Sequence, residues 1–463
     1  MKHQLDNIKR IAFLLALGMC NSCSDFIEVG YPKTEIVTDA VFVSDISAVS
    51  AVRGIYSLMM TNNSFTRGGM EEFTGIYSDE LISHASRADQ LQFFQNALTV
   101  RNTDVLGAFW REPFRYINNA NAILEGLQQP NGVSQPVRKQ LEGEARFIRA
   151  FCYFYLVNLF GDVPYLSTSD YRITSIAGRN SVEQVQHQIE ADLLVARDLL
   201  TGDFMASNNE RNQPNRGAAT ALLARHYLYT GQWTQAEAMA TQVIDQVSTY
   251  SLVSDLTRVF LANSTETIWQ LKPVVPNANA PQAPLFVLTL APNPTSRRLS
   301  LRPGFAGIFD LEDKRRSAWI GTFTNAAGSW QYSHKYKVVS NATVTEYNMV
   351  LRLAEQYLIR AEARTHLNNL DGANADVNVI RQRAGLTAQN NPDVASMLSA
   401  IELERQKEFF TEWGHRWFDL KRTNRASAIL SPLKADWQET DLLFPIPDAE
   451  RVINTNLSQN PGY

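Results

Sequence analysis

The sequence predicts a mostly α-helical fold of tetratricopeptide-like helical hairpins, with a loop-rich insertion that carries short strands. Alanines recur at helical spacing in two helix–turn–helix segments, 217–246 and 353–385. Small residues let paired helices approach closely, and each pair must stack on a neighbour to bury its open face. The proline-rich, weakly periodic stretch 248–345 separates the two segments, so they belong to one packed domain with a large insertion.

The N-terminus has the layout of a bacterial export signal. Basic residues, among them Lys9 and Arg10, precede a short apolar run over 11–19. A helix that crosses a bilayer needs about 20 apolar residues, and this run is about half that length. We therefore predict a lipoprotein signal peptide over 1–22. Residues 24–38 are predicted to form a tether.

A cysteine at the end of such a signal indicates lipidation of the mature N-terminus. Cleavage before the lipidated residue favours a small preceding side chain. Ser22 suits Cys23, whereas Met19 suits Cys20 poorly. We predict Cys23 as the lipid anchor, with Cys20 as the alternative, and a plain secretory peptide as the remaining reading.

Composition excludes several classes of protein. Of 463 residues, 44% are hydrophobic and 19% charged, as in an ordinary globular protein. The net charge is -4 and there is no long basic block, so nothing indicates nucleic-acid binding. Beyond the signal region Cys152 has no second cysteine to pair with, and it is expected as a small buried residue without an internal disulfide.

Local signals set the expected helices and their ends. Helices are expected over 46–60, 105–127 and 142–160, the last being apolar nearly all round in its second half and so deeply buried. Gly161 and Gly231 are expected to end helices in the left-handed conformation. Capping-box spacings are Ser181 with Gln184 and Thr234 with Glu237.

The insertion 248–345 differs in texture from the helical segments. It contains many prolines and short strand-like runs, 268–271 and 286–288, between loops. Loops held on a rigid scaffold often carry binding residues. We therefore expect this insertion to face the ligand.

Blocks spread along the whole mature chain carry a resemblance to a known family. They are Cys23–Glu28, Glu144–Ala150, Leu159–Tyr165, Ala221–Arg225, Tyr229–Trp233, Tyr357–Ala363, Ile380–Gly385, Glu404–Glu408, Gly414–Leu420, Leu443–Pro447 and Asn454–Tyr463. In this order they resemble the SusD/RagB outer-membrane lipoproteins of the Bacteroidetes. The middle insertion matches weakly, and it is the part expected to set specificity.

The resemblance implies a single SusD-like domain over 23–463, lipid-anchored at the outer membrane on the cell surface. It implies capture of a nutrient, most often an oligosaccharide or polysaccharide, and delivery to a SusC-like TonB-dependent transporter. A peptide-capturing, RagB-like protein is the alternative, because a fold does not fix its ligand. The resemblance implies no cofactor, no metal and no chemistry.

Catalytic motifs give little support for an enzyme. The sequence has no helical His pair for zinc, no Gly-x-Ser-x-Gly elbow and no phosphate loop. His415, beside Arg416 and Trp417, is more simply a packed and hydrogen-bonded residue at a helix end. A secreted glycoside-processing enzyme remains a distant alternative, since carboxylates are abundant.

Two stretches are the predicted ligand contacts. A sugar needs flat aromatic faces for its apolar side and planar polar groups for its hydroxyls. Trp330, flanked by Tyr332, lies in the loop-rich insertion, whereas most other tryptophans lie in regular blocks and are expected to pack internally. A buried position for Trp330 is the competing interpretation.

The second stretch lies early in the chain, where similar family members place ligand contacts. Asp79, Arg87 and Asn96 are predicted to hydrogen-bond hydroxyl groups, and Phe94 or its neighbour Phe93 to stack. The competing roles are helix capping for Asp79 and core packing for the phenylalanines.

Overall fold

The computed structural model describes residues 41–61, 64–129 and 132–463. The predicted signal peptide 1–22, the candidate lipidation residues Cys20 and Cys23, and the tether 24–38 lie outside the described residues. The chain from Phe42 to Tyr463 forms one unit. None of the helices in the described ranges is both long enough and apolar enough to cross a bilayer.

The longest of the described helices is α7 (Gln135–Phe160). Every residue from Phe147 to Val157 is buried, because nearly all of them are apolar and the one charged residue, Arg149, is paired with Asp192 at 2.7 Å. Gly161 follows with φ 71° and ψ −124°. It ends the helix as predicted, in a positive-φ conformation that glycine adopts without steric cost but not in the predicted left-handed helical one. The helix begins earlier than the predicted Glu142, since Pro136 is well suited to the first helical turn.

Helices make up most of the remaining described chain. The longer ones are α3 (Asp45–Met59), α6 (Glu112–Gln128), α9 (Val182–Leu199), α10 (Arg216–Tyr229), α11 (Trp233–Ile244), α14 (Leu353–His366), α15 (Leu370–Arg383) and α16 (Val394–Phe409). The shorter ones are α4 (Met70–Tyr77), α5 (Ala88–Gln95), α8 (Tyr171–Thr174), α12 (Gln282–Phe286), α13 (Lys314–Trp319), α17 (His415–Arg422), α18 (Ala426–Leu430) and α19 (Asp448–Ile453). Single π or 3₁₀ turns span Phe65–Gly69, Val105–Arg111, Met205–Ser207, Leu256–Arg258, Phe305–Ile308 and Glu439–Leu442.

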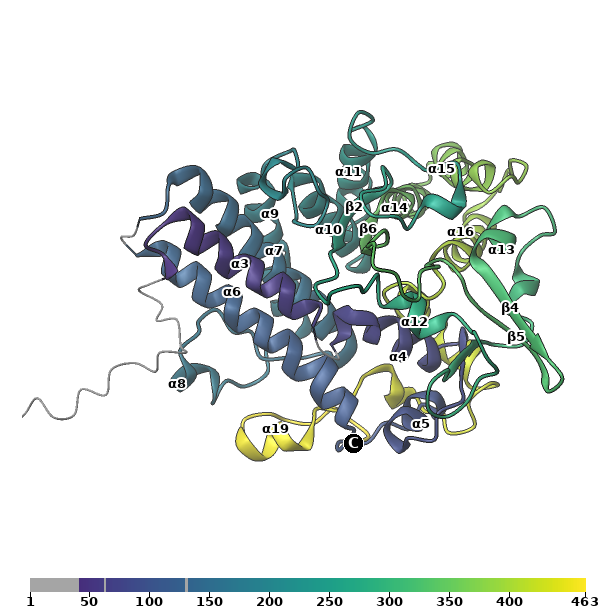
Figure 1. The fold of residues 1–463 in the computed structure, drawn as a ribbon, viewed down its shortest axis with the longest axis horizontal. Coiled ribbons are helices and arrows are strands. Elements are labelled where there is room, and N and C mark those ends of the chain that lie inside the picture. The colour runs from purple at the N-terminus through teal and green to yellow at the C-terminus, as the bar shows by residue number, and fades with distance from the viewer. Residues whose placement is uncertain (1–40, 62–63, 130–131) are drawn as a thin grey trace, which may run out of the picture. The chain divides into compact units, whose positions relative to one another are not determined.

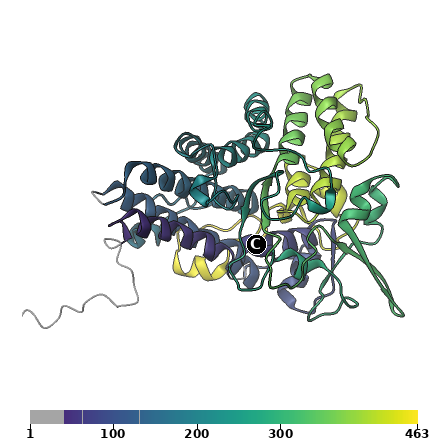
Figure 2. The ribbon, with the colours of Figure 1, turned by 45° about the horizontal axis from the view of Figure 1, so that its top comes forward.

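The helices stack as successive pairs. Helix α7 packs on α9, α10 on α11 and α14 on α15, while α9 meets α10 and α11 meets α14 (Figures 1 and 2). Ala221 of α10 and Ala361 of α14 have no exposed surface, so the alanines lie at these interfaces. Helix α11 contacts α14 directly, although residues 245–352 separate the two helices in the chain. The predicted helical fold with tetratricopeptide-like hairpins is confirmed.

One predicted helix cap is present and the other is not. The Ser181 side chain accepts a hydrogen bond from the Gln184 backbone N–H, and the Gln184 side chain accepts one from the Ser181 backbone N–H, which completes the capping box of α9. The box predicted for Thr234 and Glu237 is wrong, because α11 already begins at Trp233. The Glu237 carboxylate instead accepts from Arg364 Nε at 2.8 Å and ties α11 to α14.

The described strands form antiparallel pairs within or beside the insertion. They are β1 (Leu81–Ser83) with β3 (Leu299–Leu301), β2 (Thr267–Leu271) with β6 (Asn348–Arg352), and β4 (Ile320–Asn325) with β5 (Gly328–Ser333). The predicted strand at 268–271 is β2. The strand predicted at 286–288 is wrong: α12 reaches Phe286, because Pro281 begins a helical turn there.

A buried ion cluster fixes the insertion on the C-terminal helices. Arg352, at the end of β6, donates to Glu408 of α16 and to Glu412 in the turn after α16. It also donates to Glu266, just before β2. Lys335, two residues after β5, donates to the Glu408 carbonyl at 2.7 Å and to Glu412 at 2.5 Å. Removing one member would leave a buried charge unpaired, at a cost of about 3–5 kcal/mol. The base of the β4–β5 hairpin is therefore held firmly.

Candidate functional site

The β4–β5 hairpin extends outward from the helices beyond α13 (Figure 1). Its strands pair in register from Ile320 with Ser333 to Asn325 with Gly328. The Asn325 side chain accepts a hydrogen bond from the backbone N–H of Ala327 at 2.9 Å, which shapes the turn. The hydroxyls of Thr324 and Ser329 bond across the strands at 2.9 Å.

The register places three aromatic side chains on one face of this hairpin. Phe323 lies directly opposite Trp330, and Tyr332 follows two residues along the same strand. Gly321, opposite Tyr332, leaves space that the tyrosine ring fills: Tyr332 Cζ lies 2.3 Å from where a Cβ on Gly321 would stand. All three aromatic residues are half-buried. We call Phe323, Trp330 and Tyr332 the hairpin face.

The hairpin and the early segment come together through strand β3. Strand β5 lies beside β3, and β3 pairs with β1, which begins just after Asp79 and Glu80. The backbone N–H of Arg302 donates to the Glu80 carbonyl at 2.9 Å. The two stretches predicted as ligand contacts therefore flank one short sheet, although more than two hundred residues separate them in the chain.

Asp79 is held by an arginine from the C-terminal part of the chain. Arg416 of α17 donates to both carboxylate oxygens of Asp79, from Nε and Nη2, at 2.8 Å each. The Asp79 side chain is 13% exposed. Asp79 does not cap a helix, which was the competing role. Both of its carboxylate oxygens already accept a hydrogen bond from Arg416. Asp79 therefore orders this region more than it offers a free acceptor.

Arg87 is the most accessible of the predicted charged residues. Its side chain is 44% exposed and pairs with Asp104 at 2.5 Å and with Asp89 at 3.6 Å. Arg298, just before β3, is 34% exposed, and its Nη2 lies 3.4 Å from Glu72 Oε1. Burial raises the pKa of Glu72 above its ordinary value, and Arg298 partly offsets that rise. Two guanidinium groups thus present donors near the sheet.

His84 completes the polar groups of the short sheet. Its Nε2 lies 2.9 Å from the Ser300 hydroxyl, and partial burial lowers the pKa of the imidazole. The backbone N–H of His84 donates to the Arg298 carbonyl at 2.7 Å, which extends the β1–β3 pairing by one residue. His84 is therefore neutral at pH 7 and able to exchange a hydrogen bond with a hydroxyl group.

Phe94 and Asn96, at the end of α5, differ in their exposure. Phe94 is half-buried, with Lys434 Nζ 4.6 Å from its ring centroid. Asn96 has no exposed surface; it ends α5 in the left-handed conformation, and its amide donates to the Tyr77 carbonyl at 3.0 Å. Phe93 is likewise fully buried. Asn96 therefore shapes the turn and has no accessible surface with which to contact a ligand.

Sequence reasoning missed Phe323, Arg298 and His84. Phe323 becomes visible as a partner of Trp330 only once the strand register is known. The Trp-x-Tyr alternation at 330–332 was a usable strand signal, because residues two apart share a face. Arg298 and His84 carry no local signal, since their proximity depends on β1 pairing with a strand far along the chain.

His415, weighed above as a catalytic group, is enclosed. It is 5% exposed, and its Nδ1 lies 3.4 Å from Arg405 Nη2. Burial and the nearby arginines hold the pKa of His415 well below its usual range. It is a packed, neutral residue, as the simpler interpretation predicted. Across residues 41–61, 64–129 and 132–463, no group of three or more His, Cys, Asp or Glu side chains is placed to hold a metal ion.

Two family models match the chain in succession. One, described as starch-binding and associating with the outer membrane, matches residues 35–228, and the model of the SusD family matches residues 313–463. The chain belongs to the SusD/RagB family. The stretch between the two matches contains β2, α12, β3 and most of the insertion, which agrees with the weak resemblance seen there.

SusD-like relatives align along most of the chain. SusD-like protein P25 of Formosa agariphila is 24% identical, over 98% of this chain and 99% of the relative. The starch-binding protein SusD of Bacteroides thetaiotaomicron is also 24% identical, over 73% of this chain and 75% of its own length.

Solved structures share the fold of this SusD/RagB protein. A SusD superfamily protein from Bacteroides vulgatus superimposes with a TM-score of 0.79 at 20% identity, covering 90% of this chain and 99% of the other. A laminarin-binding SusD-like protein gives 0.77 at 22% identity, with coverage of 90% and 99%. At such identities the comparison establishes the fold alone.

Proposed function

We propose that this protein is a cell-surface lipoprotein that captures an oligosaccharide or polysaccharide and delivers it to a SusC-like TonB-dependent outer-membrane transporter. The observation that carries the proposal is the hairpin face. Three aromatic side chains lie together on an outward-reaching hairpin, next to a sheet edged by an exposed guanidinium group, Arg87, and a partly exposed one, Arg298. The family model's description as starch-binding, and the laminarin-binding neighbour of the same fold, support a glycan as the ligand.

The chemistry of the face suits a sugar. The apolar C–H side of a pyranose stacks on an aromatic ring, and such contacts contribute about 0.5–1.5 kcal/mol beyond burial of area. Arg87 and Arg298 supply charge-assisted hydrogen bonds to hydroxyl oxygens. Trp330 and Tyr332 are the proposed stacking residues. Asp79, held by Arg416, and Phe94 are proposed to support the edge of the site.

The proposed role is capture and release without chemistry. A protein that hands its cargo on should bind it with modest affinity, roughly micromolar to millimolar, or about 4 to 8 kcal/mol. One stacked aromatic and a few charge-assisted hydrogen bonds supply most of that. The buried, neutral His415 and the paired Asp79 give no support to a hydrolytic role.

The proposed location on the cell surface depends on a proposed lipid anchor. We propose cleavage after residue 22, lipidation of Cys23 with Cys20 as the alternative, and residues 24–38 as the tether. The insertion 248–345 is proposed as the ligand-facing part, since β3, β4 and β5 all belong to it. The family model's association with the outer membrane supports this location.

The decisive experiment replaces the central aromatic residue. Trp330→Ala should weaken binding of the preferred polysaccharide by roughly tenfold or more, measured by calorimetry across a panel of polysaccharides and peptides. Tyr171→Ala is the matched control, because Tyr171 is an exposed aromatic, 75% accessible, on the separate helix α8. Circular dichroism should show both variants folded.

The possible outcomes separate the alternatives. If Trp330→Ala binds like wild type, the hairpin face is not the site, and the early segment around Arg87 should be tested next by Arg87→Gln. If peptides bind and no polysaccharide does, the glycan assignment fails and a RagB-like peptide-capturing role replaces it.

A further inference from the structure

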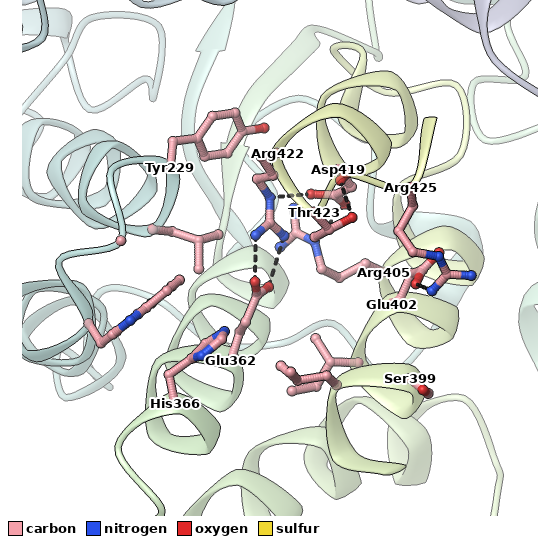
Figure 3. A pocket seen from close by; sticks show the side chains of 15 residues that line it. Tyr229, Glu362, His366, Ser399, Glu402, Arg405, Asp419, Arg422, Thr423 and Arg425 are labelled. Carbon is pink, nitrogen blue, oxygen red and sulfur yellow. Dashed lines mark hydrogen bonds and ion pairs between the residues drawn. The ribbon is translucent and has the colours of Figure 1, made fainter. Parts of the chain in front are cut away.

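A separate cavity lies among the repeat helices and the C-terminal helices. It has a volume of about 460 Å³ and is enclosed by the end of α10, by α11, α14, α16, and by α17 with the turn that follows (Figure 3). Sites for small molecules usually measure about 300–1,000 Å³. None of its lining residues belongs to the hairpin face or to the early segment. It is therefore a distinct candidate site.

The polar side of the cavity is a chain of paired charges. Arg422 donates from Nη1 and Nη2 to Glu362 at 2.5 and 2.8 Å, and from Nε to Asp419 at 2.9 Å (Figure 3). Arg405 donates from Nε to the other Asp419 oxygen at 2.7 Å. These four side chains are each at most 10% exposed. They form a rigid polar floor.

A second ion pair lies at the more open side. Arg425, 45% exposed, donates to Glu402, which is 20% exposed. The residues that line the cavity include three arginines and three carboxylates, so their formal charges cancel. They are Arg405, Arg422 and Arg425, and Glu362, Glu402 and Asp419. A ligand with a net charge would have to compete with an existing pair. A neutral ligand can add hydrogen bonds and leave every pair intact.

The floor retains capacity for hydrogen bonds. Each carboxylate oxygen of Glu362 accepts one bond from Arg422, and a carboxylate oxygen has two lone pairs. Arg405 Nη1 is buried and has no acceptor among the residues that the structure describes. An unsatisfied buried donor is costly, and Arg405 is one of the residues that line the cavity.

Another part of the cavity lining is apolar. It consists of Leu228, Leu398, Ile401 and Trp233. The Trp233 ring stacks on His366, with centroids 3.9 Å apart and planes at 10°, which fixes its orientation. A wall of aliphatic and aromatic carbon together with a floor of planar donors and acceptors matches a molecule that is apolar on one side and rich in hydroxyls on the other.

We propose that this cavity binds a neutral mono- or disaccharide. The carboxylates of the floor would accept from sugar hydroxyls, the arginines would donate to them, and the apolar wall would cover the C–H side of a ring. The proposal concerns a second site and does not depend on whether the hairpin face binds a glycan.

The test fills the cavity without disturbing an ion pair. Ser399 of α16 lines the cavity and is exposed, and its hydroxyl donates only to the Ala395 carbonyl one turn before it, at 2.9 Å. Ser399→Tyr places a ring in this space. Ser50→Tyr is the matched control, since Ser50 is exposed on α3 and donates to the Ile46 carbonyl in the same way, at 2.8 Å.

Binding is measured on the mature protein by saturation-transfer NMR and calorimetry. The probes are neutral sugars (glucose, galactose, mannose and their disaccharides), with glucuronate and free amino acids as charged probes. At least one neutral sugar should bind to wild type, to Ser50→Tyr and to Trp330→Ala, and should bind roughly tenfold more weakly to Ser399→Tyr. In a Trp330→Ala background, a sugar-induced change in tryptophan emission should be lost on adding Trp233→Phe, which tests the cavity without filling it.

Several results would overturn the proposal. The first is that no neutral sugar binds. The second is that Ser399→Tyr binds sugar like wild type and the emission response is unchanged on adding Trp233→Phe. The third is that Trp330→Ala loses all sugar binding. Binding of only the charged probes, abolished by Ser399→Tyr, would show a site for charged ligands instead. A different result would show that the hairpin face does not bind glycan: Trp330→Ala would leave polysaccharide binding unchanged.

Discussion

The buried carboxyl of Glu80 makes a sharp prediction about how stability depends on pH. Glu80 is 3% exposed; one oxygen accepts from the Thr411 backbone N–H at 3.2 Å, and the other has no partner among the described residues. Burial, reinforced by the neighbouring charge of Asp79, raises the pKa of Glu80 from 4.5 to about 8. The folded protein therefore holds this proton across a range in which the unfolded chain has lost it.

The sign of the effect follows from proton linkage. Between the unfolded pKa of 4.5 and the folded pKa of about 8, the folded state binds more protons than the unfolded state, so this group makes stability fall as pH rises. The slope is at most about 1.4 kcal/mol per pH unit, and the full loss above the folded pKa is about 4 to 5 kcal/mol. The loss is complete only above about pH 8.

Glu80→Gln removes the titration and keeps the shape of the side chain. The free energy of unfolding of the variant should match that of wild type at about pH 5. At about pH 9 it should exceed that of wild type by about 4 kcal/mol. Urea unfolding followed by tryptophan fluorescence at both pH values gives the difference in unfolding free energy. Glu183→Gln, at an exposed position on α9, is the control and should show a difference independent of pH. A constant difference between Glu80→Gln and wild type from pH 5 to pH 9 would refute the reasoning.

Two further predictions concern the scaffold and the anchor. Gly231 has φ 70°, and the nearest atom to an added Cβ is Trp233 Cζ2 at 3.7 Å, so space is available and strain alone acts. Gly231→Val should lower the free energy of unfolding by about 1–2 kcal/mol and Gly231→Asn by less; equal melting temperatures for Gly231→Val and wild type would contradict this turn. Cys23→Ala should release the protein from membranes, and a fatty-acid label that persists in this variant would move the anchor to Cys20.

The sequence alone predicted the helical part of the fold well, for a local reason. Helical periodicity, a capping box at Ser181 and glycines at 161 and 231 act within a few residues, so their outcome can be inferred from the chain itself. Local signals also misled. Thr234 has the spacing of a cap, yet α11 starts one residue earlier and Glu237 is used by Arg364 of another helix.

The sequence predicted several single residues of the candidate site, but it did not predict how these residues come together. Composition and position singled out Trp330, Tyr332 and Arg87, and all three retain accessible surface. Asp79 and Asn96 have the right chemistry for a ligand, but the fold uses them internally, through Arg416 and the Tyr77 carbonyl. A sequence does not reveal which polar side chain finds a partner hundreds of residues away.

By itself, the sequence determined which segments become helices, where several of them end, and which family the chain resembles, because those properties rest on local spacing and on ordered blocks. Only the tertiary structure decided that β1 pairs with β3, that Phe323 lies opposite Trp330, and that a charge-balanced cavity forms between α10, α14 and α16. These features depend on contacts between distant segments. Such contacts form when packing and buried ion pairs outweigh the entropy of closing long loops, a balance that no local pattern encodes.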